Sequence, residues 1–342
     1  MSRKGFDPDR LADGHRERPV IPQILAPETE AMAKGFTEIK VVGLGGAGNN
    51  TIDRMIESNV QGIDFIAVNS DVQSLDRTLA RKRVQIGERV TRGLGTGGDT
   101  RAGEKAAESA ADALYEAFHG ADMIFITAGL GGGTGSGAAP IVADIARTTG
   151  ALTVGVVTMP FSFEGTRRRA AAAEALDRLR PLLDATIVIA NDRLLAAGER
   201  LGIREAFRLA DETLHHGIQG VADLILTPGV INLDFADVRS VMHGAGTAMM
   251  AMGSAAGEGR ALRAVESALQ SPLLEAPIDG ARGILLNISG PSDLGLHEIN
   301  EAAGAVASVA HPEANIIFGA ALNPRLGSEV RVTIIATGFG HS

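Results

Sequence analysis

Cysteine and tryptophan are absent from this sequence of 342 residues, and tyrosine occurs once. Without cysteine the chain forms no disulfide, iron–sulfur cluster or thiolate zinc site, which suits a reducing cytoplasm. The scarcity of aromatic side chains argues against a stacking surface for bases, and the net charge of −9 argues against binding a nucleic acid. No apolar run reaches the ~18 residues of a membrane span. We therefore expect a cytoplasmic protein that does not bind nucleic acid.

Apolar runs and helical patterns alternate over residues 39–191, which is typical of strands buried on both faces of a parallel sheet. The predicted strands are Ile39–Leu44, Phe65–Asn69, Met123–Ala128, Leu152–Val157 and Thr186–Ala190. The predicted helices are Asn50–Ser58, Arg101–Phe118, Gly137–Thr148 and Arg168–Leu182. The pattern predicts an α/β doubly wound parallel-sheet domain that binds its ligand at the carboxyl ends of the strands.

A long helix is predicted over residues 203–226, and further strands and helices alternate beyond it. The last two predicted strands, Asn315–Ala321 and Arg331–Thr337, are joined across a turn at Pro324–Gly327, which indicates a partly antiparallel sheet. We divide the chain into a disordered extension (1–35), a nucleotide-binding domain (36–202), a central connecting helix (203–228) and a second α/β domain with a mixed sheet (229–342).

The segment Gly129–Gly137 holds six glycines in nine residues and lies between a predicted strand and a predicted helix. Glycines remove the Cβ atoms that would keep a phosphate away from the backbone, and the helix N-terminus attracts negative charge. A flexible linker is the alternative, but a linker seldom lies directly between a strand and a helix. The segment is not a Walker A loop, since no Gly-Lys-Ser/Thr ends it.

Another glycine turn, Gly43–Gly48, fits the dinucleotide pattern G-x-G-x-x-G after a strand and before a helix. Taken alone it favours a nicotinamide-dependent oxidoreductase, with Asp71 as the expected acidic residue. A third glycine-rich stretch, Thr91–Gly98, changes the balance. Several phosphate-type turns favour a nucleoside di- or triphosphate over NAD.

Together these motifs resemble FtsZ, the tubulin-like bacterial cell-division GTPase family. The tubulin-type signature is present as Gly131–Gly137, and the resemblance covers residues 39–339. The other matching segments are Asn69–Asp71, Thr91–Gly95, Pro160–Gly165, Asn191–Leu194 and Asn232–Asp237. The resemblance implies a tubulin-like fold that binds GTP or GDP with Mg²⁺.

The family's nucleotide contacts are carried over onto matching positions of this chain. Asp211 matches the residue that reads guanine, because a carboxylate accepts from both N1–H and the exocyclic amine of that base. Asn49 and Asn50 match a base-contacting position, with ordinary helix capping as an equally good explanation. The full set is Gly45, Gly46, Ala47, Gly48, Asn49, Asn50, Gly131, Gly132, Gly133, Thr134, Gly135, Glu164, Arg168, Asn191 and Asp211.

Asn232, Asp234 and Asp237 form a second group, just beyond the long helix. By themselves they are better explained as capping residues of a following helix. In FtsZ-like proteins, however, this loop enters the nucleotide site of the next subunit, where its acidic groups polarise water. We therefore assign these three residues as catalytic, and expect no metal site built from side chains alone.

The resemblance implies a GTPase that assembles head to tail into filaments for cell division or a related process. The expected partner is the chain itself, with co-polymerisation with a full-length relative left open. Typical family members continue into a linker and a terminal peptide that binds membrane-tethering partners, whereas this sequence ends with the predicted second domain. A tail-less accessory paralogue and a chain cut before its tail both fit, and we expect no direct membrane binding. A non-polymerising GTP-binding regulator and the nicotinamide enzyme remain as alternatives.

Overall fold

The structure is a computed structural model, and it describes residues 37–195, 202–226, 229–231, 233–274 and 276–339. The predicted N-terminal extension lies outside this range. None of the helices described is long and apolar enough to cross a membrane.

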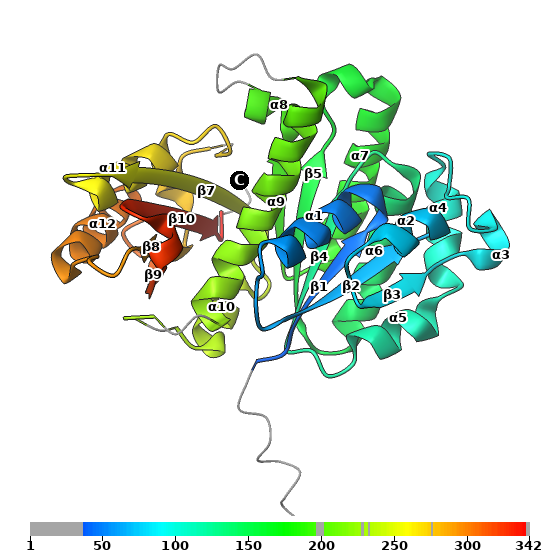
Figure 1. Cartoon of the computed structure of the whole chain (residues 1–342), viewed down its shortest axis with the longest axis horizontal. Coiled ribbons are helices and arrows are strands. Elements are labelled where there is room, and N and C mark those ends of the chain that lie inside the picture. Colours follow the sequence, from blue (N-terminus) through cyan, green and yellow to red (C-terminus); the bar gives the residue numbers. More distant parts are fainter. Residues whose placement is uncertain (1–36, 196–201, 227–228, 232, 275, 340–342) are drawn as a thin grey trace, which may run out of the picture. The chain divides into compact units, whose positions relative to one another are not determined.

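One ten-stranded sheet runs through the described chain in the order β3-β2-β1-β4-β5-β6-β7-β10-β8-β9 (Figure 1). The first six strands pair in parallel and form the amino-terminal half: β1 (Ile39–Leu44), β2 (Ile63–Asn69), β3 (Lys82–Gln85), β4 (Met123–Gly129), β5 (Leu152–Met159) and β6 (Ala185–Ala190). The carboxyl-terminal half is mixed: β7 (Gly246–Ala256), β8 (Gly283–Gly290), β9 (Asn315–Leu322) and β10 (Glu329–Thr337). A short parallel pairing of β6 with β7 joins the two halves.

Helices cover both faces of the amino-terminal half, as expected for strands that are apolar on both sides. Buried residues of α1 (Gly45–Glu57), α9 (Ile203–Leu226) and α10 (Phe235–Met242) pack on one face. The other face buries α4 (Thr100–Glu108), α5 (Ala111–Phe118), α6 (Gly133–Thr148) and α7 (Thr166–Leu179). Short helices α2 (Val72–Arg77), α3 (Glu88–Thr91) and α8 (Asn191–Leu195) lie in the connections.

Helix α9 packs on both halves of the sheet. Its buried side chains include Leu214, Ile218 and Val221, and they share one core with Ile187 of β6 and Leu285 of β8. With 24 residues at 1.5 Å each, the helix is ~36 Å long. It is therefore long enough to run from the carboxyl ends of the parallel strands to their amino ends.

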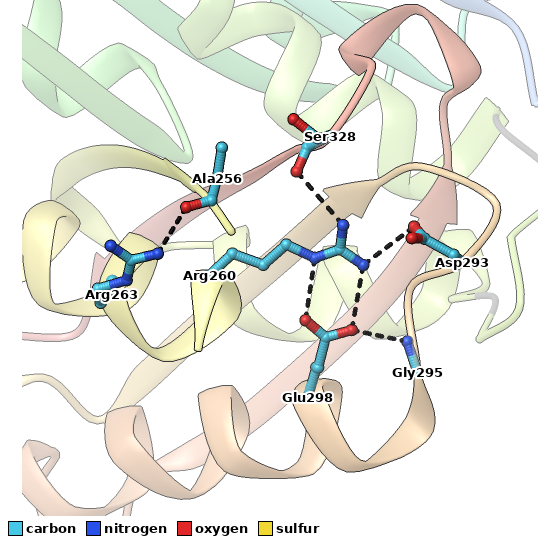
Figure 2. Close-up of polar contacts among 7 residues, drawn as sticks. All are labelled: Ala256, Arg260, Arg263, Asp293, Gly295, Glu298 and Ser328. Carbon is cyan, nitrogen blue, oxygen red and sulfur yellow. Dashed lines mark hydrogen bonds and ion pairs between the residues drawn. The ribbon is translucent and has the colours of Figure 1, made fainter. Parts of the chain in front are cut away.

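In the carboxyl-terminal half, α11 (Arg260–Leu269) and α12 (Leu296–Val309) pack on the strands and are joined by one buried arginine (Figure 2). The Arg260 guanidinium donates to both carboxylate oxygens of Glu298, at 3.0 and 3.2 Å, and to Asp293 at 3.0 Å. The hydrogen bonding between Arg260 and Glu298 lowers the pKa of the Glu298 carboxyl group. Glu298 also accepts from Gly295 N at 3.0 Å, so the arginine fixes the start of α12.

The strands and helices predicted from periodicity are present, with three differences. The helix predicted over Arg101–Phe118 is broken into α4 and α5 at residues 109–110, where Ser109 Oγ donates to Ala106 O at 2.8 Å. The last two strands are not neighbours, because β10 lies between β7 and β8. Strand β3 and the short helices α2, α3 and α8 were not predicted, whereas α10 begins directly after Asp234, where a capped helix was one of the two explanations.

Candidate functional site

A cavity of about 270 Å³ opens where four parallel strands end. Its wall includes Leu44, Gly129, Pro160 and Asn191, which lie at or directly after the carboxyl ends of β1, β4, β5 and β6. This is the edge at which open α/β sheets bind ligands. Eleven of the predicted nucleotide residues line it: Gly45, Gly46, Ala47, Gly132, Gly133, Thr134, Gly135, Glu164, Arg168, Asn191 and Asp211.

Two helix N-termini contribute to the wall of this cavity. Helices α1 and α6 begin at Gly45 and Gly133, and neither has a side-chain cap or an acidic residue in its first turn. By contrast, the nearby α4 is capped by Asp99, whose carboxylate accepts from Arg101 N at 2.9 Å. Uncapped first-turn N–H groups of helices favour an anionic ligand. The uncapped starts of α1 and α6 therefore favour an anion beside the glycine loops.

Three hydroxyl groups tie separate loops together beside the cavity. Thr134 Oγ1, in the signature segment, lies 2.7 Å from Ser70 Oγ and 3.3 Å from Thr96 Oγ1. Ser70 follows β2, and Thr96 belongs to the third glycine-rich stretch, whose Leu94 N donates to Thr91 O at 3.0 Å. The loop after β2, the third glycine-rich stretch and the signature segment thus meet at one place.

Asp211 supplies a largely buried carboxylate to the cavity wall. Its side chain is 13% exposed, and Oδ2 lies 3.5 Å from Arg54 Nε on α1. Burial raises the pKa of Asp211 to about 6, and the nearby Arg54 partly opposes this effect. The carboxylate is therefore partly desolvated and can accept hydrogen bonds from a ligand with two adjacent donors.

A second acid, Glu164, is held in place by its own segment. Glu164 Oε1 accepts from Phe161 N at 2.9 Å, and Oε2 pairs with Arg168 of α7. Asn191 lies deeper, is 5% exposed, and its Oδ1 has no hydrogen-bond partner although it is buried. An unpartnered buried acceptor in a cavity wall is what a bound polar ligand would satisfy.

Phe207 is a cavity residue that the sequence reasoning missed. It lies one helical turn before Asp211 on α9, and both residues line the cavity. Its ring meets Phe161 edge-on, with centroids 5.3 Å apart, and Phe161 stacks on Phe163. The i, i+4 spacing from Asp211 was the signal that could have revealed it, because such residues share a helix face.

Four predicted nucleotide residues do not line the main cavity. Gly48 packs against the sheet, where an added Cβ would lie 2.4 Å from Thr127 O. With its Nδ2 facing the turn, Asn49 donates to Gly43 O at 2.8 Å and to Gly45 O at 3.1 Å. Asn50 faces a neighbouring hollow, and Gly131 N donates to Ser136 Oγ at 2.7 Å.

The acidic pair lies elsewhere, at the start of α10. Asp234 is the N-cap of this helix, and its Oδ1 accepts from Asp237 N at 2.8 Å. Both side chains are exposed, and neither belongs to the cavity wall as the described residues define it. Asp234 therefore does cap α10, and the side chains of Asp234 and Asp237 nevertheless remain exposed. Asn232, the third predicted catalytic residue, lies outside the described residues.

The cavity and α10 lie at opposite ends of the parallel strands. Asp211 is 15 residues before the end of α9, a distance of ~22 Å along the helix. At that far end, Leu226 lies beside Gly62, immediately before the amino end of β2. His243, the residue after α10, contacts Asp184, which lies directly before β6 and so at its amino end. The acidic pair therefore lies near the edge from which the strands start.

Within the described part of the chain, no three histidine, cysteine, aspartate or glutamate side chains are grouped so as to hold a metal ion. A divalent cation that keeps most of its waters would be held chiefly by ligand phosphates.

Comparison with known families identifies both halves of the chain. Residues 38–199 match the sequence model of the Tubulin/FtsZ family GTPase domain, and residues 246–340 match that of the FtsZ family C-terminal domain.

Solved structures agree with this assignment. An empty FtsZ dimer from M. jannaschii is 46% identical over 90% of each chain, with a TM-score of 0.87. A mutant FtsZ from the same organism is 45% identical, covers 91% of this chain and 93% of that one, and gives a TM-score of 0.88. At 22% identity, a GTPγS-bound protofilament of CetZ2 from Haloferax volcanii shares the fold, with a TM-score of 0.69 over 90% of this chain and 94% of that one.

Proposed function

Because the chain belongs to the Tubulin/FtsZ family of GTPases, we propose that it binds GTP in the cavity and hydrolyses it within head-to-tail filaments. The observation that carries this proposal is the separation of two acidic groups by the length of α9, with Asp211 on α9 and the second group at the start of α10. Asp211 lines the cavity at one edge of the sheet, and Asp234 and Asp237 are exposed toward the other. An acid that cannot reach its own cavity can reach that of the next copy in a head-to-tail contact.

In the proposed complex, the phosphates lie against the uncapped N-termini of α1 and α6. Asp211 accepts from N1–H and the amine of guanine, which adenine does not offer as a donor pair. Asn191 Oδ1, buried and unpartnered, accepts a further hydrogen bond from the nucleotide. Glu164 and Arg168 contact the sugar and the phosphates, as the family resemblance implies.

Hydrolysis is proposed to use the neighbouring subunit. Asp234 and Asp237 of that subunit would orient and polarise the attacking water, with Asn232 as the third member of the group. Phosphoryl transfer depends on such positioning and on management of charge more than on covalent catalysis. Mg²⁺, bound through the phosphates, would offset their negative charge. Turnover then requires assembly.

The filament is proposed to serve cell division or a related process in the cytoplasm, with a second copy of the chain as the main partner. A full-length FtsZ relative is a further proposed partner, through the same contact. Both proposals depend on the carboxyl-end and amino-end surfaces of one chain being complementary.

Two measurements on the purified protein test the proposal. Nucleotide released by acid from the protein should be GDP or GTP, and GTP turnover per subunit should rise steeply with protein concentration. ATP or NAD in the extract would contradict the assignment of the cavity. Turnover per subunit that does not change with concentration would contradict the shared site and favour a non-polymerising protein.

A further inference from the structure

Helix α10 is followed directly by a histidine whose side chain contacts the amino-terminal half. His243 follows the last residue of the helix, and its N–H donates to Arg239 O at 2.8 Å. Its Nδ1 lies 2.7 Å from Asp184 Oδ1, although the ring is 64% exposed. The next residue adds a longer contact, from Gly244 N to the same oxygen at 3.4 Å.

Asp184 is itself fixed to two strands. Its side chain is 17% exposed, and its Oδ2 accepts from Thr153 N at 2.8 Å and from Thr153 Oγ1 at 3.0 Å. Its own N–H donates to Thr153 O, and its carbonyl accepts from Gly246 N at the start of β7. One carboxylate therefore links the amino ends of β5 and β6 to the turn between α10 and β7.

The carboxyl-terminal half holds the same end of α10 by a separate contact. Thr337 Oγ1, at the end of β10, donates to Val241 O at 3.1 Å. Val238 and Met242 of α10 are fully buried in the core shared by the two halves. The carboxyl end of this helix is therefore fixed from both sides, and its amino end, with Asp234 and Asp237, is exposed.

A helix of eight residues transmits the position of one end to the other over ~12 Å. We infer that His243 is a positioning residue for GTP hydrolysis: through its contact with Asp184 it fixes α10 on the amino-terminal half and sets where Asp234 and Asp237 project. The inference rests on the proposed function, in which those carboxylates act on the nucleotide of the next subunit. An error of about 1 Å in placing a catalytic group lowers a rate by up to a hundredfold.

The chain offers a matched control in α5. That helix also has eight residues and also ends in a histidine, His119, whose N–H donates to the carbonyl four residues back. The His119 ring faces Tyr115 at a centroid distance of 6.4 Å. Replacing His119 thus removes a histidine from the same helical position without disturbing α10.

The experiment compares the variants His243→Ala, His243→Asn and His119→Ala in the full-length protein. Asparagine places an amide N–H near the position of Nδ1, so it can replace the contact with Asp184 by a hydrogen bond. We expect His243→Ala to lower GTP turnover per sedimented subunit by roughly tenfold or more. The GTP affinity of the subunit and the concentration at which turnover begins should change by less than about twofold. His243→Asn should recover most of the rate, and His119→Ala should retain it.

Unchanged turnover in His243→Ala, or equal losses in the alanine and asparagine variants, would overturn the inference, because a simple structural cap would give either result. An Asp234→Asn variant measured in parallel separates the positioning role of His243 from the shared active site. If Asp234→Asn is inactive and His243→Ala is active, only the positioning role fails. If Asp234→Asn retains full turnover, the shared active site fails and the positioning role fails with it.

Discussion

The carboxylates on α9 and at the start of α10 lie in opposite settings. Asp211 is buried, is paired with Arg54, and has its pKa raised to about 6. Asp234 and Asp237, which lie beyond the carboxyl end of α9, are exposed, and the Asp234 carboxylate accepts from the backbone N–H of Asp237 at the start of α10. A desolvated carboxylate in a cavity selects a ligand by its hydrogen-bond donors, whereas exposed carboxylates at a surface can serve another molecule.

The helix N-termini show the same contrast. Around the cavity, α1 and α6 leave their first N–H groups without side-chain acceptors, whereas α10 satisfies one of its own with Asp234. Uncapped N-termini are costly unless water or a ligand completes them. The uncapped helix starts thus favour an anion beside the cavity, whereas the start of α10 presents negative charge of its own.

The largest effect is expected when charge is removed at the start of α10 without removal of the helix cap. Asparagine caps a helix as well as aspartate does, so Asp234→Asn should keep the bond to Asp237 N. We expect GTP turnover to fall by roughly 10²–10⁴-fold, the range for loss of a group that acts on the attacking water. Phosphate release gives the rate, and calorimetry at low protein concentration should show unchanged GTP affinity. An Asp234→Asn protein as active as the parent would show that Asp234 is only a cap.

At the cavity end, the expected effect is on affinity. Asp211→Ala should weaken GTP binding by ~1.5–3 kcal/mol, as expected when hydrogen bonds to a charged group are lost. The same variant should lose any preference for GTP over ITP, which lacks the exocyclic amine. Glu212→Ala is the matched control, because Glu212 is next in sequence and pairs with Arg208 at the surface. Equal affinities of the Asp211→Ala and parent proteins would remove Asp211 from base recognition.

A smaller effect should appear with pH. Since the pKa of Asp211 is about 6 and guanine requires the carboxylate form, GTP affinity should fall as pH drops through 6. The slope should approach a factor of about ten per pH unit, as for one coupled proton. Titration calorimetry between pH 7.5 and pH 5 measures it, and Asp211→Asn should show a flatter profile. A parent profile as flat as that of Asp211→Asn would contradict the raised pKa.

Stability is a poorer readout of the same proton. The raised pKa of Asp211 adds to the free energy of unfolding below about pH 4, and this contribution is lost as pH rises through 6. Burial lowers the pKa of His215 to about 4, so this group contributes the opposite slope over nearly the same range. The two slopes oppose each other in the unfolding free energy, whereas only Asp211 lines the cavity.

The glycine loops could be predicted from the sequence because their signal is local. A strand, a glycine turn and a helix follow one another at Gly43–Gly48 and again at Gly129–Gly137, and both turns line the cavity. Asp211 could not be found that way, since nothing next to it separates a ligand-binding acid from a solvated one. The resemblance to a known family supplied it.

Other features depend on contacts between distant residues. Asn49 turns toward the carbonyls of Gly43 and Gly45 because its amide is buried there and needs acceptors. The insertion of β10 between β7 and β8 follows from strand pairing, which periodicity does not encode. The contact between Asp184 and His243 joins residues 59 positions apart and leaves no local pattern. The domain boundaries and the roles of the site residues remain predictions.

The most direct test of the shared site is a mixture of two inactive variants. Asp234→Asn keeps its cavity, and Gly132→Asp keeps its acidic loop. A Cβ at Gly132 meets open space, so the substitution adds charge beside the phosphates without straining the chain. In random head-to-tail filaments, about a quarter of the contacts would join an intact cavity to an intact loop. If the active site is shared, an equimolar mixture should recover GTP turnover to about that fraction of the parent rate. No recovery in filaments that contain both proteins would contradict the shared site.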